Sequence, residues 1–182
     1  MLAFYQLYEN GTPAGAKSKN ILDTWILMRL EEVLKASTEG YEAYQLDGAT
    51  RPLTDFIDDL SVWYLRRSRD RFKEEDLSTT LRASKTDALA TLRYVLLQTS
   101  KIMAPAMPFF AEQLFAAVRE SSDVESVHLT SWPKKNKGIK VDASLMASMS
   151  EVRKVVTLAL AERAAKAIKV RQPLSLLTVK KP

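Results

Sequence analysis

The sequence lacks cysteine altogether and has only one histidine and five glycines among its 182 residues. Without cysteine the chain forms no disulfide, no thiolate metal site and no cysteine nucleophile. His128 alone cannot build a multi-histidine metal site, and the scattered glycines form no phosphate-binding loop. Asp55 and Asp59 are expected to be neighbours on a solvent-facing helix surface rather than a catalytic pair. We therefore expect that the chain by itself is not an enzyme and holds no metal or cofactor.

Long apolar runs and targeting signals are also missing. No uninterrupted apolar stretch reaches the ~20 residues that a helix needs to cross a bilayer. The first residues carry no basic leader and no small-residue cleavage site, so a secretory signal is not expected. Together with the absence of cysteine, these features predict no membrane partner and a reducing, cytoplasmic location.

Apolar residues make up 46% of the chain and recur mostly at the three-and-four spacing of amphipathic helices. The predicted fold is all-α, an antiparallel helical bundle. Proline and glycine are expected to separate the helices, with the Gly48 and Arg51-Pro52 region breaking the chain before residue 55. Helices are expected at 1–9, 20–46, 55–72, about 82–104, 109–119 and 142–169, with β-like segments at 126–130 and 174–179. Three regions follow: the end of a preceding helix and a loop at 1–16, the bundle at 17–133, and a basic C-terminal helix with the start of a junction region at 134–182.

Charge is divided unevenly along the sequence. Residues 134–182 contain twelve Lys or Arg against three Asp or Glu, whereas residues 1–133 contain fifteen against nineteen. A concentration of positive charge at one end suits a polyanionic partner there, although a solvated tail would have the same composition.

The most informative segment is residues 55–72, which carries acids at its start, aromatics at its centre and four arginines near its end. This charge order suits the helix dipole. Arg67 and Arg71 continue the apolar stripe and are expected to lie against the core with their charged heads paired or solvated. Arg66 and Arg69 point elsewhere, so they are candidates for contact with phosphate.

Several motifs occur in an order that resembles one known family. They are residues 20–30 (NILDTWILMRL), 55–72, 103–112 (MAPAMPFFAE), 125–133 (ESVHLTSWP) and 170–174 (VRQPL). Together they resemble the anticodon-binding domain of the isoleucyl-tRNA synthetases, which are class I aminoacyl-tRNA synthetases, over nearly all of residues 1–180. Two departures are visible: Lys73 stands where the family usually has Trp, and Ala106 is smaller than usual. The ATP-binding motifs of the family do not occur, so the resemblance implies that ATP and Mg belong to a catalytic domain outside this sequence.

The resemblance also implies which residues meet RNA. The main candidate is Arg29, since an arginine on the corresponding helix of the related methionine enzyme contacts the anticodon; a salt bridge to Glu32 is the structural alternative. Trp132 is either a stacking platform or a cap on the core. The remaining candidates are cationic or polar side chains suited to phosphate contacts: Lys19, Asn20, Arg66, Arg69, Arg163, Lys166, Lys169 and Arg171.

The implied partners are the anticodon stem-loop of tRNA(Ile) and the catalytic domain of the same full-length chain, with the chain itself a monomer. Two alternatives remain open at this point. The first is that the module belongs to a valyl- or leucyl-tRNA synthetase. The second is that it is a structural domain that docks against its catalytic neighbour without touching RNA.

Overall fold

The computed structural model describes residues 1–9, 18–73 and 79–179, and it divides into two compact units, Met1–Lys140 and Val141–Pro182. The first unit contains helices α1 (Leu2–Tyr8), α2 (Ile21–Glu42), α3 (Leu46–Asp58), α4 (Arg66–Lys73), α5 (Thr79–Met103) and α6 (Pro108–Val118). A π-helix, η1 (Asp59–Leu65), joins α3 to α4, and a short 3₁₀ turn, η2 (Val127–Leu129), follows α6. The second unit contains α7 (Ala143–Ala165).

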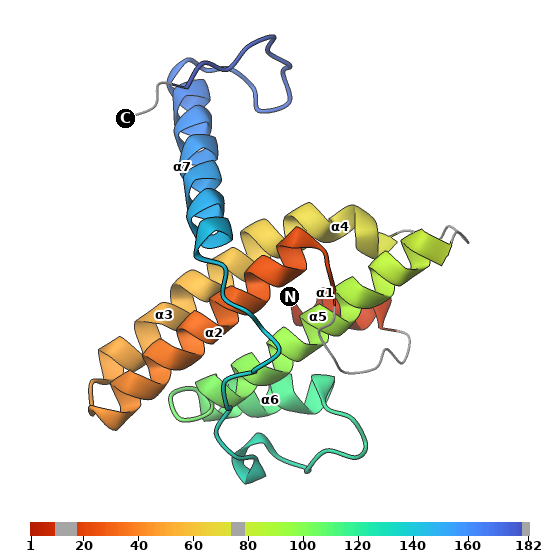
Figure 1. The fold of residues 1–182 in the computed structure, drawn as a ribbon, viewed down its shortest axis with the longest axis vertical. Helices are drawn as coiled ribbons and strands as arrows, with labels where there is room; N and C mark the ends of the chain where they lie inside the picture. The colour runs from red at the N-terminus through yellow and green to blue at the C-terminus, as the bar shows by residue number, and fades with distance from the viewer. Residues whose placement is uncertain (10–17, 74–78, 180–182) are drawn as a thin grey trace. The chain divides into compact units, whose positions relative to one another are not determined.

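Helix α2 and the continuous rod formed by α3, η1 and α4 run antiparallel and side by side, and α5 and α6 form a second antiparallel pair (Figure 1). The described residues therefore confirm the predicted all-α antiparallel bundle. Its core is filled by large apolar side chains from all of these elements, among them Trp25, Ile26, Leu30, Phe56, Leu60, Leu92, Leu96 and Phe115.

The helix boundaries near residues 42–52 differ from the prediction. α2 ends at Glu42 rather than near residue 46, because Tyr44 takes a left-handed conformation (φ 55°) that reverses the chain. α3 then begins at Leu46 and includes Pro52, which was expected to break the chain. Proline removes one backbone hydrogen bond, but Ala49, Leu53 and Phe56 bury the inner face of α3 on both sides of it. Packing therefore outweighs the local preference.

Neither predicted β-like segment is a strand. In place of a strand at 126–130 there is the 3₁₀ turn η2, whose polar groups bind side chains instead of a neighbouring strand. The Glu112 carboxylate accepts hydrogen bonds from Ser126 Oγ (2.9 Å) and from the Val127 N–H (3.0 Å). Residues 174–179 adopt no regular structure, and within the described part of the chain no strand exists with which they pair. A β pattern without a partner strand has no ladder to join.

The predicted helix ends elsewhere are close to the observed ones. Asn20 caps α2 as expected, because its Oδ1 accepts a hydrogen bond from the Leu22 N–H at 2.9 Å. α7 ends at Ala165, four residues before the predicted end, where Lys166 leaves the helix and Ala167 has a positive φ of 53°. The segment 10–16 that was expected to be a loop lies outside the described residues.

Candidate nucleic-acid interface

Arg29 lies on α2 and faces the π-helix η1. Its Nε donates a hydrogen bond to Asp59 Oδ2 at 2.7 Å, and its Nη1 forms an ion pair with Glu32, the structural alternative considered from the sequence. Burial lowers the pKa of the Arg29 guanidinium, but the hydrogen bonds to Asp59 and Glu32 outweigh this effect and raise it. The side chain keeps 22% of its surface exposed. Arg29 is therefore a fixed cation with one accessible edge.

Asp59 is buried, which corrects the expectation that it lies beside Asp55 on a solvent-facing surface. The packing against α2 is the physical reason, since Asp59 lies between the buried residues Phe56 and Leu60 in the chain and its carboxylate is bound by Arg29 of α2. Asp55 remains exposed and lines a hollow of about 360 Å³ together with Arg29, Glu32 and Arg51. The hollow is therefore lined by both acidic and basic side chains, and Arg29 is the candidate RNA-binding residue among them.

Of the four arginines of α4, Arg71 takes the inward position that the sequence predicted for it, whereas Arg67, for which the same position was predicted, does not. Arg71 turns inward, where Nη1 and Nη2 donate to the two carboxylate oxygens of Asp23, both at 2.8 Å. Tyr64 donates its hydroxyl to the same carboxylate at 2.8 Å. Arg67 is exposed, as are Arg66 and Arg69, and its guanidinium lies over the Trp63 ring, 5.2 Å from the centroid.

Lys19 and Asn20 stand at the start of α2. The side-chain oxygen of Asn20 accepts the capping hydrogen bond, so its side-chain NH₂ group is left for other contacts. Lys19 is exposed. Both positions fit a phosphate contact beside a helix N-terminus, and whether they bind RNA stays a prediction.

Trp132 packs against the C-terminal half of α2. Its indole N–H donates to Thr38 Oγ1 at 2.9 Å, and its ring meets the Tyr41 ring edge-on with centroids 5.6 Å apart. These contacts give Trp132 the capping position that the sequence offered as one alternative. The ring still borders a hollow of about 210 Å³ whose other lining residues include Lys101 and His128, so stacking also stays a prediction.

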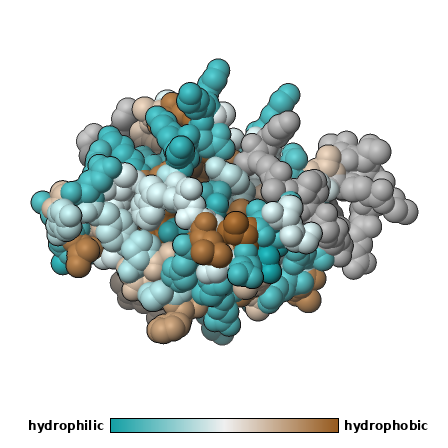
Figure 2. Space-filling model, turned by 90° about the horizontal axis from the view of Figure 1, so that it is seen from below, coloured by the Kyte–Doolittle hydropathy of each residue, from teal (hydrophilic) through white to brown (hydrophobic). Residues whose placement is uncertain are grey.

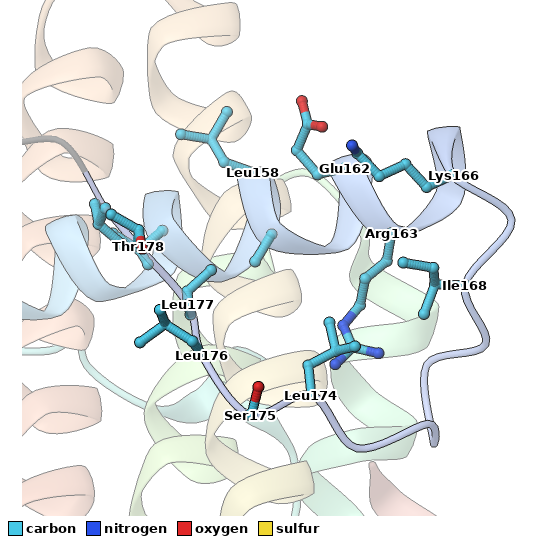
Figure 3. Close-up of a pocket in the computed structure, with 13 residues that line it drawn as sticks. Leu158, Glu162, Arg163, Lys166, Ile168, Leu174, Ser175, Leu176, Leu177 and Thr178 are labelled. Atoms are coloured by element: carbon cyan, nitrogen blue, oxygen red, sulfur yellow. The ribbon is translucent and has the colours of Figure 1, made fainter.

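The second unit holds the last four candidates. Arg163 donates hydrogen bonds to the backbone carbonyls of Lys169 (3.0 Å) and Gln172 (2.9 Å), and it thereby folds the segment after α7 back along the helix. Figure 3 shows Arg163 pointing from α7 towards this segment, with Lys166 at the helix end. Lys166, Lys169 and Arg171 are exposed. Arg163 therefore has a structural task, and the other three are available to a polyanion.

The sequence interpretation missed one group of side chains, the lysines of residues 134–140. It counted their charge but placed the basic strip on the last helix. The signal was present, since Lys134, Lys135, Lys137 and Lys140 fall within seven residues that contain no acid. Periodicity rules do not predict their geometry, because these residues lie in a segment without regular structure.

The described residues contain no group of three or more metal-binding side chains, and none of their helices is long and apolar enough to span a membrane. The exposed cations described above are spread over several helices and do not by themselves define a class of protein. The comparison with known families is more specific. The family model for the anticodon-binding domain of tRNA ligase matches residues 23–178, and the chain belongs to this family.

Similar proteins carry one name. The chain is 40% identical over 180 residues to the isoleucine–tRNA ligase of Deinococcus radiodurans. This alignment covers 95% of the chain and 16% of that relative. The chain is 39% identical over 178 residues to that of Chlamydia trachomatis serovar L2 (95% of the chain, 17% of the relative). It is 36% identical over 186 residues to that of Clostridium tetani (97% and 18%). The chain thus spans less than a fifth of the length of these relatives.

Proposed function

We propose that this domain binds the anticodon stem-loop of tRNA(Ile) and serves an isoleucine–tRNA ligase. The observation that carries the proposal is the family match over residues 23–178, together with relatives named isoleucine–tRNA ligase that align with nearly the whole chain. In this role the domain holds the decoding end of the tRNA, and ATP and Mg act in a catalytic domain elsewhere in the full-length protein. The domain itself is a cytoplasmic, monomeric binding module without catalytic activity.

The chemistry of the exposed side chains suits such a task. Loop bases of RNA are read when they unstack and meet aromatic or guanidinium planes and hydrogen-bonding edges. Arg29 offers a guanidinium whose orientation is fixed by Asp59 before the RNA arrives, which lowers the entropic cost of binding. The exposed Arg66 and Arg69 on α4 suit phosphate contacts, which orient the RNA without specifying its sequence.

A second candidate function, docking against the catalytic domain without direct RNA contact, is favoured by one observation. The start of α6 presents Met107, Phe109 and Phe110 to solvent, with Phe109 91% exposed. Apolar side chains gathered in this way are typical of a protein contact. On the face of the molecule shown in Figure 2, however, hydrophobic residues form only small separate patches in a largely hydrophilic surface.

Titration of the chain with fluorescently labelled tRNA separates the two functions. We expect tRNA(Ile) to bind and a tRNA with the same body but an unrelated anticodon loop to bind at least ten-fold more weakly. Binding of neither tRNA would support the docking function instead, whereas equal binding of both would show RNA contact without anticodon recognition and would contradict the proposal. Replacing the isoleucine anticodon by a valine or leucine anticodon in the same assay distinguishes the isoleucine enzyme from its relatives.

A further inference from the structure

Residues 134–140, which we call the lysine strap, expose four lysines in a regular pattern. Every third residue from Pro133 faces the protein: Pro133 is buried, and Asn136 and Ile139 are half-buried. The side chains between them are exposed, and these are Lys134, Lys135, Lys137 and Lys140 together with Gly138. The strap lies wholly within the first unit.

Asn136 fastens the strap to two helices. Its backbone N–H donates to the Glu31 carboxylate on α2 (3.2 and 3.3 Å), and its Nδ2 donates to the Tyr94 hydroxyl on α5 (3.1 Å). Its Oδ1 accepts a hydrogen bond from the Gly138 N–H at 2.9 Å, which closes a turn inside the strap. Figure 1 shows the coil between η2 and α7 crossing α2 and α5. The backbone of a segment without regular structure is thus held in place.

The strap presents charge and little else. Protein–protein interfaces favour aromatic residues, Met and Arg and are depleted in Lys. The strap differs from such an interface, because it is rich in Lys and its only large apolar side chain, Ile139, is half-buried. Lysine is a hydrated point charge that suits phosphates without demanding a fixed geometry. Just before the strap, Lys101, His128 and Trp132 border the hollow of about 210 Å³. Basic and aromatic groups side by side are what an RNA backbone with unstacked bases requires.

We propose that the lysine strap binds phosphates of the RNA, as a second contact separate from Arg29. Residues 29 and 31 are about 200° apart around α2, at ~100° per residue. Arg29 faces Asp59 on η1, whereas Glu31 receives the strap on the other side of the helix. The identity of the RNA as a tRNA anticodon arm rests on the proposed function, but the phosphate-binding role of the strap does not.

The test compares two charge-matched double variants of the 182-residue chain. Lys134→Gln/Lys137→Gln removes two strap charges, and Lys35→Gln/Lys154→Gln removes two charges from exposed helix positions elsewhere. The probe is an anticodon stem-loop hairpin, titrated at several salt concentrations. Each phosphate contact contributes ~0.7 to the slope of log K against log salt on single strands. We expect the strap variant to flatten the slope by about 1.4 and to weaken binding about 25-fold at 0.1 M salt.

The possible outcomes distinguish failure of the strap proposal from failure of the proposed function. If the wild-type chain prefers the isoleucine anticodon and both variants bind alike, the strap proposal is wrong and the proposed function stands. If the strap variant alone weakens binding but the anticodon has no effect, the strap proposal stands and the anticodon role is wrong. Absence of hairpin binding by the wild-type chain overturns both. Poly-glutamate serves as a second probe: loss of its binding, with hairpin binding retained, would assign the strap to an acidic protein segment.

Asn136→Ala tests the fastening separately. This variant keeps all four lysines and removes the side-chain bonds to Tyr94 and Gly138. We expect several-fold weaker hairpin binding with the salt slope unchanged, because the charges remain but must be ordered upon binding. Full wild-type affinity would show that the fastening does not matter for RNA.

Discussion

Arg66 and Arg71 lie on the same helix, α4, but their side chains have opposite tasks. Arg71 is held by the buried Asp23 through two hydrogen bonds, whereas Arg66 is exposed. The helical stripe in the sequence predicted this division, because position 71 continues the line of Leu60 and Tyr64. The sequence could not identify Asp23 as the partner, since the two residues are 48 positions apart and only the packing of α4 on α2 brings them together. Arg29 shows the same limit: Glu32 was foreseeable at i+3, whereas Asp59 was not.

Arg29→Ala is expected to weaken hairpin binding by about ten-fold, the effect of losing one base or phosphate contact. It should also lower stability, because Asp59 loses its bound cation. Binding is therefore measured by fluorescence anisotropy at a temperature where the circular-dichroism spectrum of the variant is still fully helical. Glu32→Gln is the matched control, since it leaves the bond from Arg29 to Asp59 and removes a negative charge beside the proposed site. We expect that control to bind at least as tightly as wild type; unchanged affinity of Arg29→Ala would remove Arg29 from the site.

The buried carboxyl group of Glu31 should make the stability of the chain depend on pH. Burial raises the pKa of its carboxyl, and the Asn136 N–H and the Lys135 charge offset this only in part. A group whose pKa is raised on folding adds stability below its unfolded pKa, ordinarily 4.5, and loses that contribution as the pH rises through the folded pKa. Glu31→Gln should therefore gain stability relative to wild type as the pH rises from 4 to 7, as measured by urea unfolding. Glu42→Gln, which removes an exposed charge from the same helix, is the control; a parallel change in both variants would contradict the assignment.

At the scale of whole elements, the helices that the sequence predicted from long apolar patterns are present, and the errors occur where local rules were applied alone. Pro52 was expected to end a helix, yet α3 continues through it because its inner face is buried. The 126–130 segment was expected to be extended because of its residue types, but Glu112 binds its backbone as a 3₁₀ turn. The π-helix Asp59–Leu65 follows from no periodicity rule. Such π segments occur frequently at functional sites, and this one begins at Asp59, the partner of Arg29.

The crossing of α2 and α3 depends on Gly40. A Cβ at this position would lie 2.5 Å from the Ala49 backbone nitrogen, closer than atoms can approach. The same crossing is joined by Ser37, whose hydroxyl donates to the Ala49 carbonyl at 2.7 Å. Gly40→Ala should therefore destabilise the chain by roughly 1–3 kcal/mol in urea unfolding, despite the better helix propensity of alanine.

Gly48→Ala provides the matched control within α3. The nearest atom to a Cβ there is 3.7 Å away, in ordinary contact distance, so the substitution meets no obstacle. It should stabilise the helix by about 0.5–1 kcal/mol. Equal effects of the two substitutions would show that helix propensity, and not the close approach of α2 and α3, governs both positions.

Over the whole molecule, the basic residues that the sequence concentrates in 134–182 lie in both structural units. The twelve Lys and Arg of residues 134–182 include the four lysines of the strap in the first unit and the exposed Lys166, Lys169 and Arg171 in the second. Fold class and family could be predicted because helical periodicity and ordered motifs extend over most of the chain. The surroundings of each candidate side chain could not be predicted, because surface lysines and arginines look alike in sequence whether they form ion pairs or are exposed.

Calorimetric titration of the chain with two hairpins that share a stem and differ only in the three anticodon bases tests anticodon recognition directly. We expect the hairpin with the isoleucine anticodon to bind at least ten-fold more tightly, since unstacked bases each contribute ~1–3 kcal/mol when they are bound. We also expect the difference to persist at higher salt, because base contacts release few counterions. Equal affinities at every salt concentration would contradict the central claim.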